Sequence, residues 1–239
     1  ALFDGNLFAP ADLEARAVSL LKQNMHVMVM LGNPPYNVSS SNKNAWIEAL
    51  MADYKTDLNE KMIKALSDDY IKFIRFAQYQ IEHTGEGVVA FITNNRFLDG
   101  LIHRRMRQEL LRVFDAIYIV NLHGNSRLKE KTPDGGKDEN VFNIQQGVSI
   151  NIFVKRKEKN AKAPTVFYTE LWGLRKEKED ALATLHLDAP YWKQLKPLEP
   201  NYFFVEKHVA SNQKYYTGFS LSEIFAIYSV GAVAGRDKL

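Results

Sequence analysis

The stretch from residue 27 to residue 37, VMVMLGNPPYN, restricts the fold of this chain more than any other segment. Its first five residues are apolar, and a glycine, an asparagine and two prolines follow them directly. A short apolar run bounded by Gly and Pro is typical of an interior strand of an α/β sheet. Because ligands of such sheets bind beyond the carboxyl ends of the strands, we expect residues 33–36 to face a reacting group.

This Asn-Pro-Pro-Tyr corner, residues 33–36, is stiff as well as polar. Pro34 and Pro35 fix their own φ angles, and each drives the residue before it towards an extended conformation. The Asn33 amide oxygen, the Pro34 carbonyl and the Tyr36 ring are therefore held at one point. Two hydrogen-bond acceptors beside a flat ring favour a planar ligand that carries an NH2 group.

The rest of the chain alternates predicted helices and strands. Helical patterns cover about residues 11–23, 45–64, 68–83, 101–113 and 174–185, and strand patterns cover 27–31, 88–92, 116–120, 148–154 and, more weakly, 165–169. This order predicts an α/β fold, a partial Rossmann-like sheet with flanking helices and a terminal β-hairpin. The alternation in 148–154 indicates an edge or antiparallel strand.

The sequence also supports predictions for two loops, one helix and a pair of asparagines. Residues 37–44 are small and polar, which predicts a mobile loop. Residues 123–140 form a long charged loop of a kind that is usually functional or disordered, at either edge of the sheet. We interpret the Arg-rich helix 101–113 as a solvated outer helix rather than a phosphate-binding one. Asn94 and Asn95 are interpreted as strand-end turn residues rather than pocket residues.

Composition narrows the class of protein. The 239 residues carry a net charge of +3, which permits a nucleic-acid partner without arguing for one. No cysteine is present, so disulfides and thiolate metal sites are excluded. None of the six histidines is paired with carboxylates at metal spacing, and we predict no metal site. No apolar run has the length of a membrane span, which predicts a cytoplasmic protein without membrane partners.

Residues 32–36 resemble motif IV of the amino-methyltransferases, in which such a corner follows a buried strand. Downstream segments resemble motifs V to VIII of adenine-specific enzymes in the gamma order, at residues 68–83, 85–98, 114–125 and 140–155. More weakly, residues 219–239 resemble the start of the specificity region of type ISP and type II-G restriction–modification proteins. The agreement in order favours the resemblance over a chance match to a short motif.

The resemblance implies an adenine-specific DNA methyltransferase of a restriction–modification system. Such an enzyme transfers a methyl group from S-adenosylmethionine to the exocyclic amine of an adenine flipped out of double-stranded DNA. Asn33, Pro34, Pro35 and Tyr36 would be its catalytic residues. The Asn33 oxygen and the Pro34 carbonyl would accept the amine N–H bonds and stabilise charge developing on nitrogen. Tyr36 and Phe142 would stack on the target base.

The same family binds its cofactor on a Gly-rich turn after the first strand, and none of the thirteen glycines stands in that context. The cofactor-binding residues are therefore unknown, although the corner would lie adjacent to the methyl donor. We expect residues 1–188 to be the C-terminal half of a catalytic domain, motifs IV to VIII. Residues 189–239 would be a linker and the start of a DNA target-recognition region. The fragment should be inactive without the remainder of its parent chain.

Two other functions are compatible with the corner. A protein methyltransferase acting on a glutamine side-chain amide uses the same motif, because its acceptor is again a planar NH2 group. A DNA-binding or specificity module without catalysis would keep the fold alone. The long loop, the segment resembling motif VIII and the C-terminal extension favour the DNA methyltransferase over the glutamine enzyme.

Overall fold

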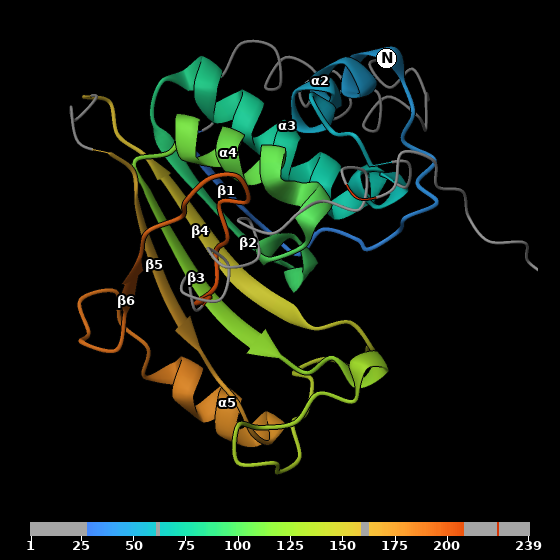
Figure 1. Cartoon of the computed structure of the whole chain (residues 1–239). Helices are drawn as coiled ribbons and strands as arrows, with labels where there is room; N and C mark the ends of the chain where they lie inside the picture. Colours follow the sequence, from blue (N-terminus) through green and yellow to red (C-terminus); the bar gives the residue numbers. More distant parts are fainter. Residues whose placement is uncertain (1–27, 61–62, 159–162, 208–223, 225–239) are drawn as a thin grey trace, which may run out of the picture. The chain divides into compact units, whose positions relative to one another are not determined.

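The computed structural model describes residues 28–60, 63–158, 163–207 and 224 (Figure 1). The chain divides into two compact units, Ala1–Val205 and Glu206–Leu239, and the fold below is that of the first. The predicted helix 11–23 lies outside the described residues, and so does the segment 219–239 apart from Ile224.

The centre of the first unit is a six-stranded mixed sheet in the order β1-β2-β4-β3-β5-β6. Its strands are β1 Val29–Gly32, β2 Gly87–Asn94, β3 Ala116–His123, β4 Val148–Lys155, β5 Thr165–Glu170 and β6 Lys193–Leu195. Strand β1 is parallel to β2, and β3 is parallel to β5, while β4 lies antiparallel between β2 and β3. Strands β1, β2, β3 and β5 therefore end at one edge of the sheet, where β4 begins. We call this the carboxyl edge.

The α/β class and the terminal hairpin, β3 with β4, are confirmed. The sequence missed β6, whose three residues pair antiparallel with β5. Strand β4 is antiparallel as predicted, but it lies inside the sheet. Its alternation reflects polar groups that are buried, because the Asn151 side chain donates to the Thr93 hydroxyl at 3.0 Å across the β2–β4 pair.

The prediction that the first apolar run is an interior strand is wrong for the described part of the chain. Among the described strands, β1 lies at the end of the sheet and pairs only with β2. The side chains of Val29 and Leu31 are 59% and 75% exposed. An apolar run indicates that a strand favours burial, but it does not indicate which residues bury that strand.

Among the described residues, four α-helices flank the sheet, namely α2 Ala45–Lys55, α3 Asp69–Thr84, α4 Arg104–Val113 and α5 Arg175–Ala183. Helices α2, α3 and α4 lie together over one part of the sheet, and α5 lies near the end of β5 (Figure 1). Ile71, Ile74 and Ile81 of α3 are fully buried and pack in one core with sheet residues. Helix α2 ends nine residues before the predicted end at Lys64. Thr56, directly after the helix, is extended, and Asp57 has a left-handed φ of 53°.

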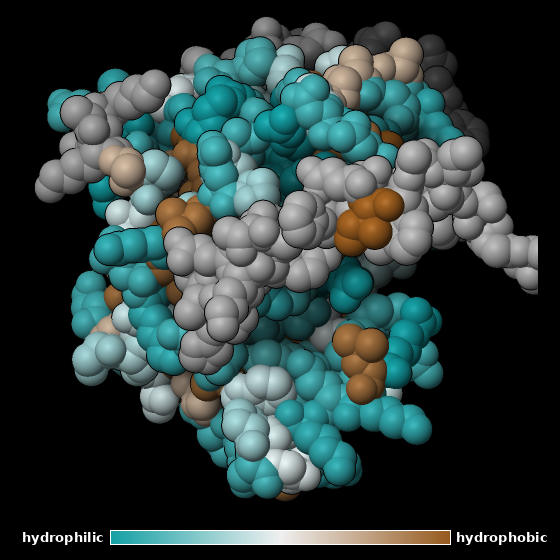
Figure 2. Space-filling model, in the orientation of Figure 1, coloured by the Kyte–Doolittle hydropathy of each residue, from teal (hydrophilic) through white to brown (hydrophobic). Residues whose placement is uncertain are grey.

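Short 3-10 helices connect these elements. They are η1 Lys64–Ser67, η2 Asn95–Leu98, η3 Leu101–His103 and η4 Ser126–Leu128. On the face shown in Figure 2, hydrophobic side chains occur in small separate groups among hydrophilic ones. No helix among the described residues is long and apolar enough to cross a membrane.

The Arg-rich helix is not simply a solvated one, which corrects the sequence interpretation. Arg107 is fully buried, and its guanidinium donates to the Phe97 carbonyl at 2.6 Å and the Gly100 carbonyl at 2.9 Å. It also donates twice to the Asn201 carbonyl, at 2.9 and 2.6 Å. The Phe204 amide donates to the Leu98 carbonyl at 2.9 Å. Buried carbonyls that require partners thus fasten the segment near Asn201 to α4.

Candidate functional site

The topology brings the predicted site residues to the carboxyl edge. The Asn-Pro-Pro-Tyr corner follows β1, and Asn95 follows β2 at the same edge. The loop 123–140 leaves the end of β3 and returns before β4, so it also lies at the carboxyl edge. Phe142 stands between this loop and β4. Long-range pairing settles the position of the loop, which sequence alone had left open.

Within the corner, Asn33 and Pro35 are exposed, whereas Pro34 is buried. The Asn33 side chain forms no hydrogen bond with another described residue, so its amide oxygen is available as an acceptor. Tyr36 is partly buried, and its ring meets the Tyr70 ring edge-on at a centroid distance of 5.9 Å. Burial, and secondarily the Asp68 charge, raises the pKa of Tyr36 to about 12, so this phenol stays neutral at ordinary pH.

The loop that follows the corner is fastened to the start of α3, in contrast to the mobile loop that we predicted for residues 37–44. The Asn37 amide donates to the Asp68 carboxylate at 2.7 Å, and the Asp69 amide donates to the Asn37 carbonyl at 3.3 Å. Asp69 also accepts from the Ser40 hydroxyl at 2.5 Å and from the Asn42 side chain at 2.9 Å. These partners lie about thirty residues away, so the loop composition did not reveal them.

Lys72 completes this network beneath the loop. Its side chain is 3% exposed, and its ammonium lies 3.2 Å from the Glu48 carboxylate of α2. The same ammonium donates to the Ser40 hydroxyl at 3.3 Å and to the Asn42 carbonyl. A buried ammonium needs such partners to offset its lost hydration. The loop is therefore held by α2 and α3 together.

Phe142 and Tyr36 share one hydrophobic cluster. Both are partly buried and pack with the buried side chains of Val120, Leu122 and Val148. These three residues come from the carboxyl end of β3 and the start of β4. The two aromatic rings that sequence assigned to the target base are thus placed in the same part of the fold.

Asn94 and Asn95 use their side chains locally. The Asn94 oxygen accepts from the Arg96 amide at 2.9 Å and caps η2. The Asn95 amide group donates to the Asn121 oxygen of β3 at 3.0 Å. These contacts are those of strand-end residues that fix a turn.

The sequence analysis missed one histidine with two carboxylate partners. His123, at the end of β3, lies 2.8 Å from Glu130 through Nδ1 and 3.2 Å from Glu170 through Nε2. Its ring stacks on Trp172 with a centroid distance of 3.3 Å. Glu130 and Glu170 are 7 and 47 residues away in sequence, so no short motif indicated the cluster. No group of three or more His, Asp or Glu side chains in the described ranges could hold a metal ion.

The two carboxylates of this cluster favour the protonated form of His123. Burial lowers the pKa of His123, but the hydrogen bonds from its ring to Glu130 and Glu170 outweigh burial, and the pKa is raised. The bond with His123 is the main reason that the pKa of Glu170 falls to about 2. The cluster joins β3, the long loop and β5 at the carboxyl edge.

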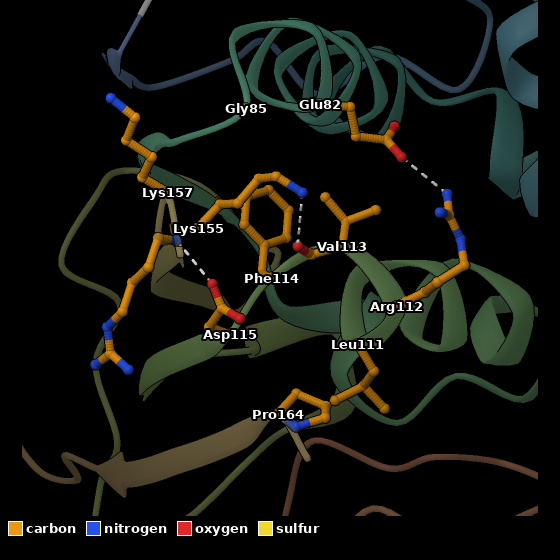
Figure 3. Close-up of a pocket in the computed structure, with 11 residues that line it drawn as sticks. Glu82, Gly85, Leu111, Arg112, Val113, Phe114, Asp115, Lys155, Lys157 and Pro164 are labelled. Atoms are coloured by element: carbon orange, nitrogen blue, oxygen red, sulfur yellow. Dashed lines mark hydrogen bonds and ion pairs between the residues drawn. The ribbon is translucent and has the colours of Figure 1, made fainter. Parts of the chain in front are cut away.

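A separate pocket of about 330 Å³ lies at the opposite edge of the sheet (Figure 3). Phe114, Asp115 and Lys155 are among its lining residues, at the start of β3 and the end of β4. The Lys155 ammonium contacts the Val113 carbonyl at 3.5 Å, and Asp115 accepts from the Arg156 amide at 2.7 Å. Because the antiparallel pairing places these residues at the far end of β4, the pocket is distinct from the corner.

The glycine turns after β3 and β5 do not form a cofactor site. The amides of Gly124 and Gly173 both donate to the Asp138 carboxylate, at 2.6 and 3.0 Å. A cofactor loop needs such amides free to meet its ligand. Here the side chain of the protein itself occupies them, so these turns do not fit a bound S-adenosylmethionine.

The fold is similar to folds found in solved restriction–modification enzymes. The structure is similar to that of the ATP-dependent Type ISP restriction-modification enzyme LlaBIII bound to DNA, with a TM-score of 0.66 and 26% identity over 83% of this chain. It is also similar to DrdV in a DNA complex, with a TM-score of 0.66 and 25% identity over 79% of this chain. A nuclease-deletion mutant of the Type ISP enzyme LlaGI, with a DNA substrate mimic, shares the fold at a TM-score of 0.68 and 23% identity over 86% of this chain.

The chain belongs to the Eco57I restriction-modification methylase family, whose model matches residues 6–128, slightly more than half of its length. The chain spans only 14%, 19% and 20% of the LlaBIII, DrdV and LlaGI chains. A comparison with curated proteins found no match.

Proposed function

We propose that this chain is the target-base half of an adenine-specific DNA methyltransferase that uses S-adenosylmethionine. The observation that supports this proposal most is the exposure of Asn33 in the Asn-Pro-Pro-Tyr corner at the carboxyl edge. Asn33 is exposed and its side chain has no partner among the described residues, while Pro34 beside it is buried and fixed. Solved structures of similar fold contain DNA, which supports double-stranded DNA as the partner.

The chemistry of the proposed reaction explains the residue types. The lone pair of an adenine amino group is delocalised into the ring, so the nitrogen is a poor nucleophile. The Asn33 oxygen and the Pro34 carbonyl would accept its two N–H bonds and favour the tetrahedral nitrogen that attacks the methyl group. Tyr36 and Phe142 would hold the flipped base between aromatic surfaces. Positioning of base and donor supplies much of the remaining rate enhancement.

The remainder of a longer parent chain would hold the methyl donor. The exposed apolar side chains of β1, at the end of the sheet, are consistent with a sheet that continues into further strands. Residues 1–188 would then form the C-terminal half of the catalytic domain. Residues 189–239 would contain a linker and the beginning of a target-recognition region, in addition to β6 and the segment near Asn201, which belong to the first unit.

The proposal is tested by assaying the parent protein with radiolabelled methyl donor on plasmid DNA and on release-factor protein. We expect label in DNA adenine, and we expect Asn33→Ala to remove it. The exposed Asn59, which follows α2, gives a matched control in Asn59→Ala. Label on a protein glutamine would establish the alternative enzyme. Unchanged DNA methylation in Asn33→Ala would refute the catalytic assignment. The isolated chain should transfer no methyl group.

A further inference from the structure

We propose that Arg175, in the first turn of α5, is a positioning residue that holds Phe142 in place for the target base. This inference rests on the proposed function, because it assigns a role to a residue that acts through Phe142. Phe142 lies in a segment, residues 141–147, without helix or strand. Its backbone must therefore be fixed by contacts from elsewhere in the fold.

Arg175 provides these contacts. Its Nε donates to the Asn140 carbonyl at 2.9 Å, and its Nη2 donates to the Phe142 carbonyl at 3.1 Å. The same Nη2 donates to the Asn143 side chain at 2.9 Å. One guanidinium thus contacts the residues on both sides of Phe142 and Phe142 itself. A lysine cannot reproduce this arrangement, because an ammonium is a point charge without a planar fork of donors.

Helix α5, which carries Arg175, is itself held in place by a buried ion pair. Lys178, one turn further along α5, lies 2.6 Å from Asp138, and both side chains are 0% exposed. Lys178 also donates to the Leu122 carbonyl at 2.8 Å and the Glu139 carbonyl at 2.6 Å. The pair is therefore well satisfied, as a buried pair must be to persist. It fixes α5 against the end of β3 and against the loop that leads to Phe142.

The side chain of Asn140, directly before this segment, holds it through further hydrogen bonds. The Phe142 amide donates to the Asn140 side-chain oxygen at 2.9 Å. The Asn140 amide group in turn donates to the Gly124 carbonyl at 3.0 Å and the Gln146 carbonyl at 2.6 Å. The ring of Phe142 packs on the cluster that includes Tyr36. Loss of Arg175 therefore removes one support while the Asn140 hydrogen bonds remain, which predicts a displaced rather than an unfolded segment.

The test uses the complete parent protein with Arg175→Ala and Arg175→Lys. Lys176→Ala is the matched control, since Lys176 is an adjacent exposed cation whose ion-pair partner in the described part of the chain is the exposed Asp180. Methylation is measured as kcat and as KM for DNA. A DNA substrate with 2-aminopurine in place of the target adenine reports on stacking of the flipped base by its fluorescence. Thermal unfolding is recorded for each variant.

We expect both Arg175 variants to lower kcat by about 10²-fold, the usual effect of misplacing a reactant by an ångström. KM for DNA should change little, and 2-aminopurine fluorescence in the complex should rise because the flipped base stacks less well. Lys176→Ala should match the unaltered protein. A folded Arg175→Lys protein with unchanged kcat and unchanged fluorescence would overturn the inference. If Asn33→Ala still methylates DNA, the proposed function itself has failed, and this outcome is separate.

Discussion

Asp68 accepts a hydrogen bond from the backbone amide of Asn37 at 2.7 Å, which links the cap of α3 to the residue directly after Tyr36. Burial raises the pKa of Asp68, while the bond from Asn37 opposes that rise. A carboxylate at a helix N-terminus is also stabilised by the helix dipole. The geometry of the corner is therefore set by a helix that begins more than thirty residues later.

Asp68→Ala should detach this link, whereas Asp68→Asn keeps an oxygen acceptor in the same place. A hydrogen bond to a charged group contributes about 1.5–3 kcal/mol to stability, and we expect Asp68→Ala to lose a comparable free energy of unfolding. Methylation by the parent protein should fall with it. Urea unfolding and methyl transfer measure both effects, with the exposed Asp180→Ala as control. An Asp68→Ala variant as stable and as active as the unaltered protein would show that this bond is unimportant.

Tyr36 should act through its ring and not through its hydroxyl. The hydroxyl is buried and has no hydrogen-bond partner among the residues that the structure describes. Removing a buried polar group that lacks a partner costs little and can stabilise a protein. Tyr36→Phe should therefore keep methylation and stability, while Tyr36→Ala should lose methylation. A large loss of kcat in Tyr36→Phe would show that the hydroxyl has a role in the reaction.

Arg107 should be among the most sensitive residues of α4. Its replacement by Leu leaves the carbonyls of Phe97, Gly100 and Asn201 buried without this donor. Each such group costs about 1–3 kcal/mol, so the free energy of unfolding should fall by several kcal/mol. Arg105→Leu is the control, because Arg105 pairs with the exposed Asp57 and surface pairs contribute about 1 kcal/mol or less. Similar losses in both variants would contradict the assigned role of Arg107.

Local patterns predicted the elements of this fold because each depends on neighbouring residues. Helix α3 was predicted within one residue, since the apolar face that indicates a helix is local in sequence. Strand β2 was also found, although it extends beyond the apolar run at both ends. The corner itself was visible because glycine, proline and an aromatic residue restrict the backbone at fixed spacing.

The remaining features depend on partners that are distant in sequence. The exposure of β1 is a property of the sheet order, which no pattern within residues 27–31 contains. The burial of Arg107 requires Asn201, which is 94 residues away. The anchoring of Phe142 by Arg175 spans 33 residues and leaves no repeat or motif. Tertiary contacts, rather than local propensity, therefore decide how the candidate site is supported.

The contribution of His123 and Glu170 to the free energy of unfolding of the first unit should decrease towards both high pH and low pH. Its pKa is raised in the folded state, so its stabilising effect is fully present below the ordinary value of 6.5 and is lost as pH rises through the raised value. The pKa of Glu170 is lowered from 4.5 to about 2, so its effect is present above 4.5 and is lost as pH falls towards 2. The cluster should therefore stabilise the fold most between these two ordinary values.

The measurement is the free energy of urea unfolding of the protein and of its His123→Gln variant from pH 3 to pH 9. The difference between the two should be largest in the window between the ordinary pKa values of Glu170 and His123, about 4.5 to 6.5. It should shrink on either side, because one member of each pair then loses its charge. His83→Gln is the control, since the His83 ring contacts only the Tyr79 ring and carbonyl among the described residues. A difference that stays constant across the whole pH range would mean that His123 contributes by packing on Trp172 and not by its charge.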